Sequence, residues 1–176
     1  LDIGRPDLRE YDYIRFSENN RTIFAGTILS IAQRDLENPT LSYRIYDLSL
    51  ASNADYLANV FVDMSFPSGA NVTQILLGNH AGDPWYQATL GEFYGIVEVR
   101  VVNEGISVGN LDDFQNVVLS DPAYLWGQPV SGVLDQLADV SGAWWEVTPD
   151  KVFNMRLTSS REVAPIALTE NTSAYN

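Results

Sequence analysis

The sequence predicts a mainly β protein in which a small antiparallel β-barrel is followed by an α+β domain. Short apolar runs with period-2 alternation and tight polar turns fill residues 11–48, which is typical of a barrel or sandwich. An amphipathic helix followed by a hairpin fills residues 130–157, which indicates an α+β unit. We therefore expect a β-barrel domain at 1–55, its first part only, an α+β domain at 56–165, and a return segment at 166–176 that leads toward further domains.

The barrel is predicted to contain three strands in this part of the chain, over residues 12–17, 22–31 and 41–48. In the first strand Ile14 and Phe16 share one face. The second strand has Gly26 in its middle, and a glycine inside a strand often marks a bulge or a sharp bend, as at a barrel corner. The charged segment 33–40 contains Asn38-Pro39 and is predicted to be a loop.

The next segment begins with a short helix after the turn at residues 66–69. Apolar residues at 72, 75 and 76 share one helix face, Asn71 is a suitable N-cap, and Gln74 completes a pattern similar to a capping box. Gly78 is expected to end this helix. Residues 85–93 could be helical, 94–102 are rich in Val and Ile and predict a strand, and 109–113 predict a turn.

The clearest helix spans residues 130–141. Pro129 stands at its first turn and Gly142 at its end, both favourable positions for these residues. Its apolar stripe consists of Val133, Leu134, Leu137 and Ala138. A hairpin with strands at 143–148 and 152–157 follows, and we expect Leu137 to pack against it.

Composition excludes several classes of function. The chain has no cysteine, which removes disulfides, thiolate nucleophiles and most structural zinc sites. No apolar run reaches the roughly 18 residues that a membrane span requires. The net charge of −13 repels phosphate and argues against sequence-specific nucleic-acid binding. Such charge commonly serves solubility, and it would also suit a surface that nucleic acid passes without sticking.

No set of residues predicts catalysis, cofactor binding or a metal site. His80 is the single histidine, so a triad or a two-histidine metal site would lack partners. Asp112-Asp113 could bind a cation or support a hydrolase, but it follows a predicted turn, and turn and cap contacts explain it more simply. The remaining acidic candidates, Asp47, Asp55 and Glu146, are isolated in the sequence.

Aromatic residues leave a second alternative open, a carbohydrate-binding adhesin or receptor-binding module of a virion. It would use the four tryptophans as a sugar-stacking platform: Trp85, Trp126, Trp144 and Trp145. Trp144-Trp145 begins a predicted strand, so one ring must point inward. Core packing plus a subunit contact is the simpler interpretation.

Several segments, in order, resemble the baseplate hub or tail hub proteins of tailed bacteriophages, in their N-terminal part. The barrel-like segments are Arg21–Ile28 and Tyr43–Ser49; the later ones are Phe66–Leu76, Glu104–Gly109, Leu111–Asp113, Val133–Ala138, Ser141–Gly142, Trp144–Trp145, Thr148–Phe153, Leu168–Asn171 and Tyr175. Residues 80–103 depart from the family pattern as an insertion. Family hubs continue past this point, so we expect the chain to be a piece of a longer protein.

The resemblance implies a structural subunit of the virion, synthesised in the host cytoplasm and without catalytic residues. It implies a homotrimeric ring that joins the tail tube to the central spike or tip and forms part of the DNA exit channel. Its partners would be tail tube or distal tail proteins, a spike or tip protein, and the tape measure protein. An acidic lumen would suit this role, because like charge keeps passing DNA from binding.

Overall fold

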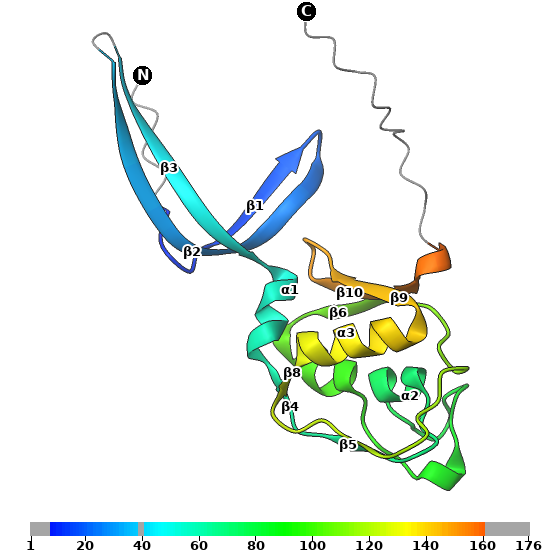
Figure 1. The fold of residues 1–176 in the computed structure, drawn as a ribbon. Helices are drawn as coiled ribbons and strands as arrows, with labels where there is room; N and C mark the ends of the chain where they lie inside the picture. Colours follow the sequence, from blue (N-terminus) through cyan, green and yellow to red (C-terminus); the bar gives the residue numbers. More distant parts are fainter. Residues whose placement is uncertain (1–7, 39–40, 161–176) are drawn as a thin grey trace, which may run out of the picture.

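The computed structural model describes residues 8–38 and 41–160, which form a projecting β-sheet joined to an α+β body (Figure 1). The sheet contains β1 (Tyr13–Glu18), β2 (Arg21–Asn38) and β3 (Leu41–Ser52), antiparallel and in the order β1-β2-β3. The mainly β, α+β fold class and the three predicted strands are confirmed. The predicted return segment, 166–176, lies outside the described residues.

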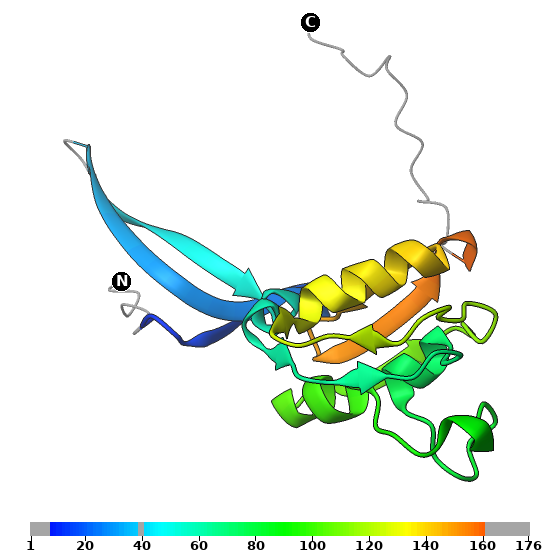
Figure 2. The same cartoon turned by 60° about the horizontal axis from the view of Figure 1, so that its bottom comes forward.

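The predicted barrel is not closed within the described residues, where this sheet stays open. β1 and β3 are its outer strands, and within the described residues they do not pair with each other. A barrel requires its outer strands to meet, and small barrels use five or more strands. β2 has 18 residues and β1 only 6, so the far half of β2 pairs with β3 alone. The result is a two-stranded arm, residues 30–38 with 41–49, that projects from the body (Figures 1 and 2).

The loop predicted at 33–40 is also largely wrong. β2 continues to Asn38, and its ladder pairs Gln33 with Tyr46 and Asn38 with Leu41. Charged residues favour solvent, and a strand that pairs on one edge only can satisfy that preference as well as a loop does. Period and polarity alone therefore could not separate the two. Residues 39 and 40 lie outside the described residues.

Gly26 is where the sheet has no room for a side chain. It pairs with Ile14 on one side and Ser52 on the other. A Cβ built at Gly26 would collide with the carbonyl oxygen of Ala51. The β2–β3 register shifts just beyond it, between Ile28 and Ser30, so the irregularity expected near this glycine is present.

The body begins with helix α1, whose N-cap is Ser52, so the chain leaves the sheet there. Its elements are α1 (Asn53–Tyr56), η1 (Leu57–Asn59), β4 (Phe61–Val62), β5 (Ser65–Phe66), α2 (Val72–Leu77), η2 (Ala88–Leu90), η3 (Val97–Val101), η4 (Val102–Glu104), β6 (Ser107–Leu111), β7 (Ala123–Tyr124), β8 (Gln128–Pro129), α3 (Val130–Ser141), β9 (Ala143–Val147), β10 (Val152–Leu157) and η5 (Thr158–Ser160). Its sheets are β6-β10-β9, β4-β8 and β5-β7. No helix in the described part is long and apolar enough to cross a membrane.

Both well-patterned helices are confirmed, including their caps. In α2 the Asn71 side chain accepts from the Gln74 backbone, and the Gln74 side chain accepts from the Asn71 backbone, each at 2.9 Å. α3 starts after Pro129 and ends at Gly142, whose φ of 61° is left-handed. The predicted stripe of α3, Val133, Leu134, Leu137 and Ala138, is buried together with Phe153 and Met155 of β10.

Between α2 and α3 three predictions fail. Residues 85–93 contain the short 3-10 helix η2 and no α-helix, and 94–102 contain the π-helix η3, at Val97–Val101, rather than a strand. Ile96, Val97 and Val101 are fully buried in the core, so tertiary packing overrides the strand preference of β-branched residues. A turn was predicted at 109–113, but residues 109–111 belong to strand β6. Gly109 permits this, since a Cβ there would collide with the side chains of Val152 and Asn154 on β10.

Candidate assembly surfaces and the predicted site residues

The β2–β3 arm leaves both of its edges without a neighbouring strand in the described residues. Nearer the body, the sheet buries little: Ala25 and Ile28 are enclosed, while apolar side chains stand in solvent at Tyr13, Phe16, Ile23 and Leu29. A two-stranded ribbon is marginally stable by itself in water, and free edges accept further strands. The sheet therefore has the character of an incomplete structure that a partner would extend.

The junction between sheet and body is held by a specific set of contacts around Tyr13. The Tyr13 hydroxyl donates to the carbonyl of Pro149 at 3.1 Å. The amide of Asn53, which is 8% exposed, donates to the Thr148 and Pro149 carbonyls at 3.1 and 3.3 Å and contacts the Tyr13 hydroxyl at 3.3 Å. These bonds join β1, α1 and the β9–β10 turn, so the sheet has a defined orientation on the body.

Charged side chains reinforce the same junction. Arg15 of β1 forms an ion pair with Asp150 at 3.1 Å, and the Lys151 ammonium lies 5.4 Å from the Tyr13 ring centroid. The Arg15–Asp150 pair is largely exposed, and such pairs contribute about 0–1 kcal/mol. The Asn53 bonds are better shielded, so we assign most of the orientation to them.

His80 lies at the start of the segment that departs from the family pattern. Its Nε2 is 2.9 Å from Oε2 of Glu98, and its ring meets the Tyr94 ring edge-on at a centroid distance of 5.3 Å. The hydrogen bond to Glu98 raises the pKa of His80, partial burial opposes the rise, and the charges of Glu98, Asp83 and Glu92 add to it. Among residues 8–38 and 41–160, no three His, Asp or Glu side chains gather to hold a metal ion.

Asp112 and Asp113 are both occupied by local hydrogen bonds. The Asp112 carboxylate accepts from the Leu157 backbone at 2.7 Å and from the Ser160 hydroxyl at 3.1 Å. Asp113 accepts from the Gln115 backbone two residues on, at 2.9 Å. Asp112 therefore ties the end of β6 to the end of β10, and Asp113 shapes a turn. A cleft of about 230 Å³ lies beside them.

The four tryptophans contact different neighbours. The Trp85 indole donates to the Gly78 carbonyl at 3.0 Å, and that of Trp145 donates to Asp135 at 2.8 Å, with its ring 6.2 Å from Phe153. Trp144 is half-buried beside it on β9. Only Trp126, at 71% exposed, stands well out of the surface. Trp85 therefore packs within its own loop, and Trp145 joins β9 to α3 and β10.

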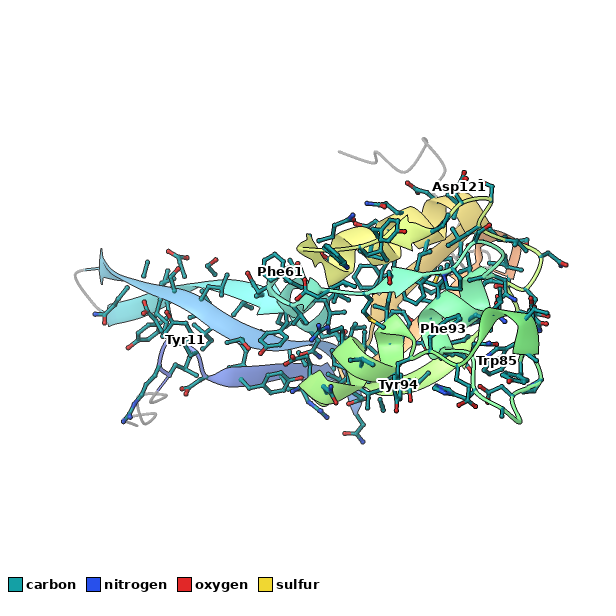
Figure 3. All side chains as sticks on the ribbon, turned by 90° about the horizontal axis from the view of Figure 1, so that it is seen from below. Tyr11, Phe61, Trp85, Phe93, Tyr94 and Asp121 are labelled. Carbon is teal, nitrogen blue, oxygen red and sulfur yellow. The ribbon has the colours of Figure 1, made fainter. Side chains whose placement is uncertain are left out.

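A buried amide pair organises residues 79–93, and the sequence reasoning missed it. Asn79 and Gln74 are both fully buried. Gln74 donates to the Asn79 side chain and to the Trp85 carbonyl, each at 2.9 Å, while Asn79 donates to the Gln87 carbonyl at 2.9 Å and the Gly91 carbonyl at 2.6 Å. The loop labelled by Trp85 and Phe93 in Figure 3 is therefore built around one side chain.

Comparison with known proteins shows a likeness of fold to a solved structure. No protein-family model matches the chain, and no curated protein matches it in sequence. The fold is similar to that of the 43 kDa tail protein of prophage MuSo2 from Shewanella oneidensis, with a TM-score of 0.58 and 11% identity. The match covers 89% of this chain and 40% of that one, so the chain corresponds to less than half of the prophage protein. The sheet, the arm and the body described above thus share their fold with part of a solved prophage tail protein.

Proposed function

We propose that this chain is a structural subunit of a phage tail or of a tail-like particle, positioned in the baseplate or tail-tip hub. The observation that carries the proposal is the arm, which projects from the body with free strand edges and exposed apolar residues at its base. The name of the structural neighbour, a prophage tail protein, supports the same role. The ordered motifs that resemble tail hub proteins support it independently.

In this role the arm is an assembly element. We propose that neighbouring copies, as a homotrimer, place their sheets side by side. Each free strand edge of one copy would then pair with a strand of the next copy. The ring would join tail tube or distal tail proteins to a spike or tip, with the tape measure protein passing through it. A net charge of −13 would leave the channel repulsive to DNA that exits through it.

The test is the oligomeric state of the whole protein, measured by analytical ultracentrifugation and by imaging of ring-shaped particles. Leu29→Asp changes a residue at the base of the arm that is 49% exposed. It should leave the subunit folded and abolish the ring. Val102→Asp is the matched control, because Val102 is 44% exposed on the body. A ring that survives Leu29→Asp, or a wild-type protein that stays monomeric at assembly concentrations, would count against the proposal.

A further inference from the structure

A two-stranded ribbon crosses the body beside α3 (Figure 2). β4 pairs with β8 and β5 with β7, and the bonds from Leu125 to Met64 and from Gly127 to Val62, both 2.9 Å, connect the two pairs into one ribbon. Residues alternate along it, so that Val62 and Phe66 are buried. The ribbon therefore has a core side and a solvent side.

The solvent side of this ribbon is aromatic. Phe61, Tyr124 and Trp126 are 53%, 67% and 71% exposed, and the last two rings meet at 80° with centroids 6.3 Å apart. Asp63 lies on the same side, where its carboxylate accepts from the Gly127 backbone at 3.3 Å. We call Phe61, Asp63, Tyr124 and Trp126 the aromatic ribbon face. Exposed aromatic clusters of this kind mark interaction sites, since tyrosine and tryptophan dominate the binding energy of interfaces.

An apolar groove of about 150 Å³ lies between the ribbon strand and α3. It is lined by Leu119, Ala123, Leu125, Val133, Leu137 and Val140. Val140 is 64% exposed at its rim, and the exposed carboxylates of Asp139 and Asp121 belong to the two segments that border it. Figure 3 shows the ribbon between the labelled Phe61 and Asp121. Ala123 and Leu125 alternate with Tyr124 and Trp126, so the groove lies on the other side of the same strand from the aromatic ribbon face, between that strand and α3. It offers a place for one apolar side chain of a segment that bends around the strand edge.

We propose that this surface docks a segment of another protein in which an arginine stands beside an apolar side chain. A guanidinium can lie against the Trp126 ring while it pairs with Asp63, a combination that lysine satisfies less well. The apolar neighbour would enter the groove. The proposal rests on this surface alone and does not depend on the role in a phage tail.

Charge and ring geometry argue against the other occupants. A second copy would bring the same carboxylates and a net charge of −13 against this face. A sugar stacks on a flat aromatic surface, whereas the Tyr124 and Trp126 rings stand nearly perpendicular. The acidic rim, and the two rings that lie nearly perpendicular to each other, together favour a basic and apolar protein segment.

The experiment titrates the whole protein with the amidated peptide Leu-Arg-Leu-Arg-Leu and follows amide shifts by NMR. The matched probe replaces both arginines by citrulline, which keeps the shape and removes the charge. We expect the arginine peptide to bind about tenfold more tightly. Trp126→Ala and Asp63→Asn should each weaken it by a similar factor. Tyr11→Ala, at a tyrosine that is 77% exposed beside the projecting sheet (Figure 3), should change nothing.

Four results would overturn the proposal. The first is equal affinity for the citrulline peptide, and the second is no binding of the arginine peptide at millimolar concentration. The third is binding of N-acetylglucosamine oligomers that Trp126→Ala abolishes, which would make the surface a carbohydrate site. The fourth is a dimer of the wild-type chain that Trp126→Ala dissociates, which would assign the face to a second copy. Because all these residues are exposed, unchanged unfolding midpoints would show that the variants are folded.

Discussion

At the scale of single residues, the hydrogen bond between His80 and Glu98 can be tested directly through the pKa of His80. Its hydrogen bond to Glu98 raises its pKa, so the imidazolium is the form that the folded protein stabilises. That stabilisation is complete below the ordinary imidazole pKa of about 6.5 and is lost as pH rises through the higher folded value. We expect the ring protons of this single histidine to titrate above 6.5 by NMR, and in Glu98→Gln to titrate at lower pH. An unchanged midpoint in Glu98→Gln would mean that this bond is not formed.

Asn79 gives a second prediction at this scale. Asn79→Ala leaves buried groups of Gln74 and of two backbone carbonyls without their partner. The free energy of unfolding should fall by about 1–3 kcal/mol, as measured by urea denaturation. Asn110→Ala is the control, because Asn110 is exposed and surface changes usually stay within about 0.5 kcal/mol. Equal losses in both variants would refute the organising role of Asn79.

The Asn71–Gln74 cap and the hydrogen bonds of Asn79 show what the sequence could and could not predict about single positions. The Asn71–Gln74 cap was predictable, because its bonds join residues three apart on one helix turn. The bonds of Asn79 were not, since their acceptors at Gln87 and Gly91 depend on how the whole loop is folded. Local pairs are encoded by spacing, whereas buried amide networks are decided by tertiary structure.

At the scale of elements, α3 carries the stability of the body. Leu134 is fully buried, while Leu137 is 7% exposed and also lines the groove beside the ribbon. Leu→Ala in a core costs about 2–5 kcal/mol, and the cost grows with the cavity left behind. We expect Leu134→Ala to fall in the upper part of that range and Leu137→Ala in the lower part. Equal unfolding midpoints for Leu137→Ala and wild type would contradict its placement in the core.

Some elements of this fold could be predicted from the periodicity of the sequence, whereas others are determined by tertiary packing. The helix at 130–141 and the hairpin after it were predictable, because their periodicity is strong and their ends carry Pro129 and Gly142. The π-helix at 97–101 was not, since Val-rich segments suit a strand or a buried helix equally. The end of β2 was missed because residues 33–38 are mostly polar and charged, and such a segment lacks the apolar alternation that predicts a strand.

At the scale of the whole molecule, the junction at Asn53 should fix how the sheet stands on the body. The chain has no cysteine, so labels at Glu18→Cys and Asp139→Cys are unambiguous. We expect one narrow distance distribution between the two spin labels in the parent chain and a broader one after Asn53→Ala. In the control variant Asn110→Ala, the distance distribution between the two spin labels should remain as narrow as in the parent chain. A distribution as narrow after Asn53→Ala would show that the Arg15–Asp150 and Lys151 contacts suffice.

Assembly gives the final prediction at this scale. If neighbouring subunits cover the arm, amides in residues 33–38 of β2 should exchange quickly in the free subunit and slowly in the assembled particle. The comparison is made by hydrogen exchange with mass spectrometry, with β10 as an internal reference that pairs on both sides. Equal exchange of 33–38 in both states would place the subunit contacts elsewhere, first in residues 80–103. We expect the amides of the N-terminal residues 8–10 to show the same change, with fast exchange in the free subunit and slow exchange in the assembled particle.

The unpaired edges of the arm have a consequence for the solubility of the chain as a free monomer. A long unpaired strand edge is a template for any other extended chain, so unassembled chains are prone to aggregate. The sequence of β2 carries charged residues at 34, 35 and 37, and charges on an edge strand reduce this hazard. Overproduction of a variant whose ring assembly is blocked should therefore give more insoluble protein than overproduction of the wild-type chain. For such a chain, prompt assembly after synthesis affects the yield of soluble protein as much as the stability of the fold does.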